Sequence, residues 1–167
     1  MHAAATRFFT ENLKDYKLSN VLEIGSININ GSVRDMYPNA TSWYGIDIVD
    51  GPCVDEVADG SEWCSSERYG VAICAEVFEH TPKWREIILN MHFHLEDGGL
   101  LLASCASRDR PPHSANGDNL GVDEYYHNVS PKEMDELLSS MKWKSYEVIE
   151  ADGDFGNDDL YIKCVKG

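Results

Sequence analysis

The chain has 167 residues, of which 43% are hydrophobic and 26% are charged. This is about one domain of ordinary globular composition, which excludes a collagen, a coiled coil and a disordered chain. The formal net charge of −15 repels phosphate backbones, so we expect no nucleic-acid partner.

Strands and helices alternate along most of the chain. Apolar residues near helical spacing predict a first helix within residues 4–16, inside an N-terminal segment 1–18. The other predicted helices, opened by Ser, Thr or Pro start signals, are residues 32–37, 81–95 and 130–141. The predicted strands are residues 20–25, 42–47, 53–57, 70–75, 100–104, 143–149 and 160–165.

This order of elements predicts an α/β fold and a single domain over residues 1–167. We expect a doubly wound, mostly parallel seven-stranded sheet with one antiparallel edge strand and helices on both faces. In such sheets ligands bind at the carboxyl ends of the strands. The irregular segment 105–129, rich in Pro, Gly, Asn and His, is expected to form a loop on the substrate side.

The chain shows no signal for export or membrane insertion. No stretch reaches the roughly 18 apolar residues of a membrane span, and the N-terminus lacks a secretory apolar core. Five cysteines without metal spacing predict free thiols in a reducing compartment, so we expect a cytoplasmic protein. The acidic stretch 152–159 lacks the glycine and the glutamate of a calcium loop, and no metal site is predicted.

Glycines and acids follow the predicted strands. Gly25 allows a ligand to approach the backbone closely, and Asn28 and Gly31 can adopt positive φ in the loop that follows. Asp47 follows Gly25 by 22 residues and could accept hydrogen bonds from two ribose hydroxyls. Asp59 could accept one from an adenine amino group. Together these residues suit an adenosine-containing ligand.

These motifs resemble those of class I S-adenosylmethionine-dependent methyltransferases of the small methyltransferase-domain type. The similarity covers roughly residues 18–140, and it depends on several motifs in the right order rather than on one decisive motif. The matching segments are residues 21–25, 44–48, 54–60, 74–81, 95–101 and 125–131.

The resemblance implies a Rossmann-like fold and S-adenosylmethionine as cofactor, with S-adenosylhomocysteine as product. Glu23 would organise the loop near the methionine amino group, Ile48 would pack on the adenine, and Glu76 and Val77 would line the methionine and substrate side. The cofactor-binding residues that it implies are Glu23, Gly25, Ser26, Asn28, Asp47, Ile48, Asp59, Gly60, Ala75, Glu76 and Val77.

The glycine loop departs from the family pattern. The family commonly has Gly-x-Gly-x-Gly or Gly-x-x-x-Gly, whereas Gly25 and Gly31 are six residues apart here. Either the loop is longer and still cradles the methionine end, or the affinity for the cofactor is weakened. A nicotinamide dehydrogenase is excluded because the chain lacks Gly-x-Gly-x-x-Gly and Tyr-x-x-x-Lys.

The implied activity is methyl transfer by in-line displacement to a small molecule or an exposed sugar or metabolite group, as O- or N-methylation. His80, His113 and His127 are the candidate bases, and Tyr125 and Tyr126 are the candidate substrate contacts. The alternative is a non-catalytic module or partner subunit that binds S-adenosylmethionine or S-adenosylhomocysteine. The short pocket cover favours a small acceptor and leaves open a homodimer that completes the pocket.

Overall fold

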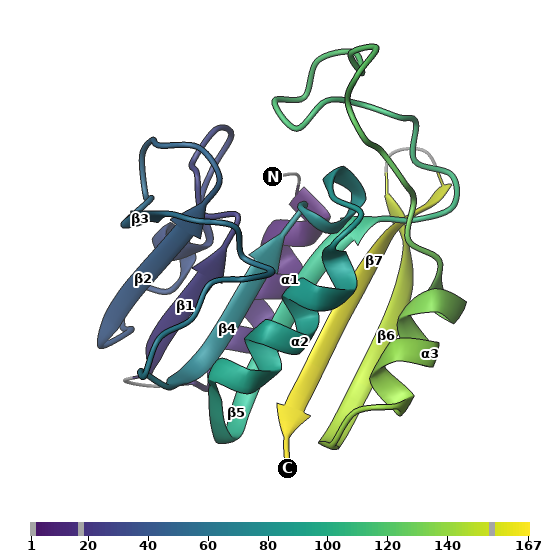
Figure 1. Ribbon diagram of the computed structural model, residues 1–167. Helices are drawn as coiled ribbons and strands as arrows, with labels where there is room; N and C mark the ends of the chain where they lie inside the picture. Colours follow the sequence, from purple (N-terminus) through teal and green to yellow (C-terminus); the bar gives the residue numbers. More distant parts are fainter. Residues whose placement is uncertain (1–2, 17–18, 154–155) are drawn as a thin grey trace.

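Seven strands form one sheet in the computed structural model, which describes residues 3–16, 19–153 and 156–167 (Figure 1). Their order in the sheet is β3-β2-β1-β4-β5-β7-β6. The strands are β1 (Asn20–Ile24), β2 (Ser42–Asp47), β3 (Glu56–Val57), β4 (Tyr69–Ala75), β5 (Leu95–Ala106), β6 (Trp143–Gly153) and β7 (Gly156–Lys166).

The sheet is mostly parallel, as the sequence predicts. Strands β3, β2, β1, β4 and β5 pair in parallel, whereas β7 runs antiparallel to both β5 and β6. The antiparallel strand therefore lies one place in from the edge, with β6 outside it. The connection from β1 leads outward to β2, and the connection from β4 leads the opposite way to β5. A topological switch point, where such folds bind ligands, thus lies between β1 and β4.

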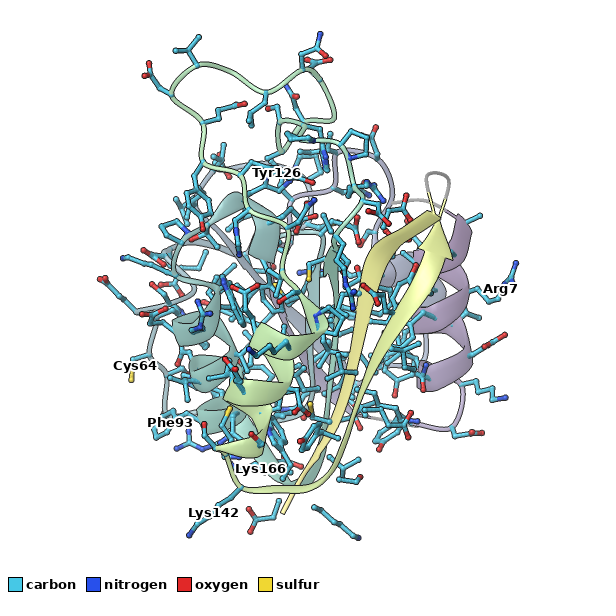
Figure 2. The ribbon with its side chains drawn as sticks, turned by 90° about the vertical axis from the view of Figure 1, so that its right-hand side faces the viewer. Arg7, Cys64, Phe93, Tyr126, Lys142 and Lys166 are labelled. Atoms are coloured by element: carbon cyan, nitrogen blue, oxygen red, sulfur yellow. The ribbon has the colours of Figure 1, made fainter. Side chains whose placement is uncertain are left out.

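Helices cover both faces of the sheet (Figures 1 and 2). Helix α1 (Ala3–Leu13) packs on one face, while α2 (Trp84–His94) and α3 (Pro131–Ser139) pack on the other. Neighbouring residues of a central strand point to opposite faces, so Val21 packs with the α1 side and Leu22 with the α2 side. Burial of each such side chain contributes about 1.5–3 kcal/mol, which fixes the register of the strands that carry the site.

Two predicted elements are shorter in the structure. The predicted helix 32–37 is a single 3-10 turn, η1 (Val33–Met36), which ends before Pro38. The predicted strand 53–57 keeps only β3, because Cys53 has a left-handed φ of 73° that interrupts extended backbone.

Other elements start or end elsewhere than predicted. Strand β5 begins at Leu95 rather than at Leu100, because a register shift between Tyr69 and Val71 of β4 accommodates the residues in between. Helix α2 starts only at Trp84, after a second 3-10 turn, η2 (Phe78–His80), that the sequence did not predict. This turn places the candidate site residue His80 just beyond β4.

The irregular segment 107–130 crosses above the carboxyl ends of the parallel strands (green in Figure 1). None of these described residues belongs to a helix or strand. Arg110 ties the segment to β7 through a 2.7 Å ion pair with Asp159, and the backbone of His127 donates to Glu79 O at 2.8 Å. The segment ends at the predicted capping box, in which Ser130 caps α3.

The predicted thiol state is confirmed, since all five cysteines are free. Cys74, Cys105 and Cys164 are buried, whereas Cys64 is exposed at the edge of the molecule (Figure 2). Over the described part of the chain, no helix has the length and apolar character that crossing a membrane requires.

Candidate functional site

A cavity of about 470 Å³ opens at the carboxyl ends of β1, β2 and β4. This size is typical of a small-molecule site. Ten of the residues predicted for the site line it: Glu23, Gly25, Ser26, Asp47, Ile48, Gly60, Ala75, Glu76, Val77 and His80. Residues 40 or more positions apart in the sequence thus share one cavity.

Gly25 allows β1 to approach the turn after β4. Its φ is +77°, and a Cβ added there would collide with the Cγ2 of Val77. Any other residue would therefore be strained by its backbone and by the side chain opposite. Because Gly25 has no side chain, the backbone at the end of β1 stays accessible from the cavity.

Asp47 anchors the loop that follows β1. Its two carboxylate oxygens accept hydrogen bonds from Ile27 N and Val49 N, each at 3.1 Å. A carboxylate has about four acceptor positions, so Asp47 can still accept from two ligand hydroxyls. It is 9% exposed, which keeps it at the cavity wall.

The loop after Gly25 is shaped by glycine and not by asparagine. The positive φ angles belong to Gly25 and Gly31, whereas Asn28 does not adopt one, contrary to expectation. Asn28 instead accepts a hydrogen bond from Gly31 N at 2.9 Å through Oδ1 and does not line the cavity. An asparagine favours such a side-chain turn because its amide oxygen bonds its own backbone a few residues on.

Two buried polar atoms of the cavity wall lack a hydrogen-bond partner among the described residues: Glu23 Oε2 and Ser26 Oγ. Burial raises the pKa of Glu23 to about 8, although the nearby Arg34 opposes the shift. The Arg34 Nε lies 3.7 Å from Glu23 Oε2. Unpaired buried acceptors are costly, so this wall suits a ligand with hydrogen-bond donors, as the ammonium group of S-adenosylmethionine has. Arg34 was not predicted, because only the fold brings η1 to β1.

The β2 side of the cavity carries an exposed apolar surface. Ile48 lines the cavity and is 73% exposed, so a flat ring could pack on it. Asp59 does not line the cavity, although Gly60 does. The Asp59 carboxylate accepts hydrogen bonds from Ser61 Oγ and Lys83 Nζ, and these bonds lower the pKa of Asp59 to about 2.

The cavity is acidic. Four acidic side chains line it, those of Glu23, Asp47, Glu76 and Glu124, of which Glu23 is neutral at pH 7 because of its raised pKa. No lysine or arginine is among the described residues that line it. Such a field favours a cationic ligand and disfavours a phosphate-bearing one. Glu76 also has a positive φ of 57° at the end of β4, a strained conformation of the kind found at functional sites.

Two of the three candidate histidines meet at one end of the site. The rings of His80 and His113 lie 5.1 Å apart, edge to face, and Tyr126 lies 5.5 and 5.0 Å from them. Figure 2 shows Tyr126 at the base of the irregular segment. Burial is the main cause that lowers the pKa of His80 to about 4, so this imidazole is neutral at pH 7.

The candidate base His127 and the candidate substrate contact Tyr125 lie away from this cluster. The Nε2 of His127 is 3.1 Å from Glu133 Oε1, so this ring lies against the start of α3. Tyr125 is 41% exposed and does not line the cavity.

The irregular segment contributes cavity residues that the sequence analysis did not identify. Ser114 and Glu124 both line the cavity, and Ser114 Oγ donates to Glu124 Oε1 at 2.8 Å. No motif marks them, and only the path of the segment across the strand ends brings them there.

A protein-family model described as "Methyltransferase domain" matches residues 1–151 of the chain. No curated protein sequence matches it.

Several solved structures share the fold. The N-methyltransferase NodS from Bradyrhizobium japonicum, in complex with S-adenosylhomocysteine, has 17% identity and a TM-score of 0.66, over 98% of this chain and 85% of NodS. The 1,6-didemethyltoxoflavin-N1-methyltransferase from Burkholderia thailandensis has 16% identity and a TM-score of 0.70, over 98% of this chain and 78% of that one. The DhpI complex with S-adenosylhomocysteine has 18% identity and a TM-score of 0.71, over 98% of this chain and 85% of DhpI.

Proposed function

The chain belongs to the methyltransferase-domain family, whose model matches residues 1–151, and from this we propose that it methylates a small-molecule amine or hydroxyl. The expected resemblance to class I S-adenosylmethionine-dependent methyltransferases is thereby confirmed. The protein is an enzyme of this class, and its cofactor is S-adenosylmethionine. The acceptor and the residue roles given below are our proposal.

One observation carries this proposal. Gly25, Asp47 and Glu76, at the ends of three different strands, share one acidic cavity at the switch point of the sheet. The sulfonium and ammonium groups of S-adenosylmethionine are cationic, and an acidic wall stabilises both charges. A dinucleotide would bring phosphates into the same field and would be repelled.

The cavity residues divide into three groups along the cofactor. Asp47 would accept the ribose hydroxyls, and Ile48 would pack against the adenine. Glu23 and Ser26, with their unpaired oxygens, would accept from the methionine ammonium group. Asp59 is assigned to the adenine amino group, which would require a free acceptor position beside Ser61 and Lys83.

The chemistry divides between cofactor and protein. When bound, S-adenosylmethionine supplies a methyl group already activated by its sulfonium. The protein has to align the acceptor, exclude water and remove one proton. His80 lines the cavity and contacts His113, so we assign the activation of the acceptor to this pair. His127 is left out of the assignment because it lies against α3.

A small acceptor fits the cover of the site. The irregular segment supplies Ser114, Ala115, Asn116 and Glu124 to the cavity wall. Two of the solved neighbours are named as N-methyltransferases, and the one from Burkholderia thailandensis holds the small molecule 1,6-didemethyltoxoflavin. Such acceptors would reach the methyl group from the side of the histidine pair.

The test is calorimetric titration with S-adenosylmethionine and S-adenosylhomocysteine, followed by an acceptor screen. We expect roughly micromolar binding. Asp47→Ala should weaken it at least about tenfold, since each hydrogen bond to a charged group contributes about 1.5–3 kcal/mol. Asp50→Ala is the matched control, because Asp50 is exposed and does not line the cavity.

Each result has a clear meaning. Failure of both ligands to bind would overturn the assignment of the cavity. Binding without methyl transfer to any amine or hydroxyl tested would instead support the non-catalytic module.

A further inference from the structure

We propose that Glu79, His80 and His113 bind a divalent transition-metal ion at the acceptor end of the cavity. The three side chains each bring one ligand atom, and these atoms all lie within 4.8 Å of one another. Metal binding is inferred from this geometry. The catalytic role given to the ion below rests on the proposed function.

The distances fit a site that needs little contraction. In a tetrahedral zinc site with bonds of about 2.0–2.2 Å the ligand atoms lie about 3.3 Å apart, so the three groups must close by up to about 1.5 Å. Glu79 and His80 are held on η2, which follows β4 directly. His113 belongs to the irregular segment, where a rotation of its side chain can supply the movement.

Glu79 supplies the second, independent observation. Its side chain is fully buried, at 0% exposure. Oε1 accepts a hydrogen bond from Ala106 N at 3.1 Å, whereas Oε2 is buried with no hydrogen-bond partner in the described parts of the chain. An unsatisfied buried carboxylate oxygen is costly. A bound cation would satisfy it.

The histidines can present lone pairs. The His113 Nδ1 lies 3.0 Å from Pro111 O. A carbonyl oxygen can only accept, so Nδ1 carries the proton and Nε2 keeps its lone pair. A backbone carbonyl that fixes the ring in this way is a typical outer partner of a metal-bound histidine.

The donor set indicates the class of ion. Two imidazoles and one carboxylate suit zinc and related transition metals, whereas magnesium prefers oxygen ligands alone. Three protein ligands leave a fourth position open, as in catalytic zinc sites. Because His80 itself lines the cavity, an acceptor bound there could take the fourth position. The ion would then lower the proton affinity of the acceptor's oxygen or nitrogen.

The experiment measures metal binding directly. Protein treated with a chelator and then freed of it is titrated with Zn²⁺ by calorimetry, and with Co²⁺ by visible absorption. We expect one ion per chain and the intense absorption of four-coordinate Co²⁺, with no competition from Mg²⁺. His113→Ala and Glu79→Gln should each weaken zinc binding at least about tenfold, since even outer-shell changes cost this much.

The controls keep the result interpretable. His92→Ala removes a half-buried α2 histidine that bonds Lys142 O and lies outside the proposed metal site, and it should leave zinc binding unchanged. Glu79→Gln alters a buried group and could unfold the protein, so His113→Ala decides the question if it does. Absence of zinc binding by the wild type, or unchanged binding in His113→Ala, would overturn the proposal.

Cofactor binding separates this proposal from the proposed function. Titration with S-adenosylmethionine on the same samples should succeed for the wild type and for His113→Ala. Zinc binding without cofactor binding would leave the metal site standing and overturn the function. Cofactor binding without zinc binding would leave the proposed function standing and overturn the metal site. If both bind, chelation should reduce methyl transfer and Zn²⁺ should restore it.

Discussion

Two glycines share a backbone conformation but differ in what surrounds them. Gly25 has φ of +77° and Gly98 has φ of +78°. A Cβ at Gly25 would collide with Val77, whereas one at Gly98 would meet nothing within 4 Å. The pair therefore separates the cost of left-handed backbone from the cost of steric collision beside the cofactor.

We expect Gly98→Ala to lower the free energy of unfolding by about 1–2 kcal/mol, the cost of a left-handed residue with a Cβ. Gly25→Ala should cost more, by roughly 1–3 kcal/mol of overpacking, and should weaken binding of S-adenosylmethionine. Urea denaturation and calorimetric titration measure the two effects. Adding Val77→Ala to Gly25→Ala should recover part of the extra loss. Equal losses in the two glycine variants would contradict the argument.

The sequence predicts which residues line the cavity where each of them follows a strand. Gly25, Asp47 and Glu76 all line the cavity, because the carboxyl ends of parallel strands meet at one edge. It could not predict that His80 meets His113, since no local pattern specifies the path of the irregular segment. The unpaired oxygen of Glu79 is likewise a product of tertiary packing.

At the scale of elements, two arginines of the irregular segment make ion pairs of different burial. Arg110 is 18% exposed in its side chain and pairs with Asp159, whose side chain is fully buried. Arg108 is 60% exposed and pairs with Glu150 at 2.8 Å. The first pair joins the segment to β7 inside the protein, and the second joins it to β6 at the surface.

We expect Arg110→Ala to lower the free energy of unfolding by about 3 kcal/mol, because it leaves the charge of Asp159 buried without its arginine. Arg108→Ala should cost less than about 1 kcal/mol, as exposed ion pairs do. Urea denaturation gives both values. Limited proteolysis should also cut the irregular segment faster in Arg110→Ala. Similar stability of the two variants would show that the buried pair does not hold the segment.

The bounds of a strand were predicted correctly where the pattern of burial repeats along it. They were predicted wrongly where a local contact with the partner strand sets them. The bounds of β2 match the prediction, because its neighbours on both sides impose the strand. The strand predicted over residues 100–104 starts at Leu95 as β5, because a register shift between Tyr69 and Val71 of the partner strand β4 includes the residues before Leu100. Such a shift depends on the partner strand, which the local sequence does not contain.

At the scale of the whole molecule, the acidic composition includes carboxylates that the fold removes from water. Burial raises the pKa of Glu23 to about 8, from an ordinary value of 4.5. Burial is also the main cause that lowers the pKa of His94, whose ordinary value is 6.5. His94 is buried and accepts from Ser65 N at 3.1 Å through Nε2, so its role is structural. The two groups oppose each other in their effect on stability.

The signs follow from proton uptake. Between about pH 8 and 4.5 the folded chain holds a proton on Glu23 that the unfolded chain lacks, so stability rises as pH falls through this window. Below about pH 6.5 the unfolded chain protonates His94 before the folded chain does, so this group lowers the stability as pH falls further. Glu79, with its pKa also raised to about 8 by burial, adds to the first effect, and His80, with its pKa lowered to about 4 mainly by burial, adds to the second. The two histidines then offset the two glutamates, so the free energy of unfolding should rise from about pH 8 to about pH 6.5 and change little below it.

Urea denaturation of the chelator-treated protein at about pH 8.5, 6.5 and 5 tests this expectation. Glu23 alone should contribute about 2 kcal/mol between pH 8 and 6.5, at about 1.4 kcal/mol per unit. Glu23→Gln should remove that share of the rise, because glutamine has no proton to take up. His94→Gln should let the stability keep rising below about pH 6.5, because the opposing contribution of His94 is removed there. A wild-type stability that is greatest at pH 8 or above would contradict the raised pKa of Glu23 and would mean that its carboxyl group is ionised in the folded protein at pH 7.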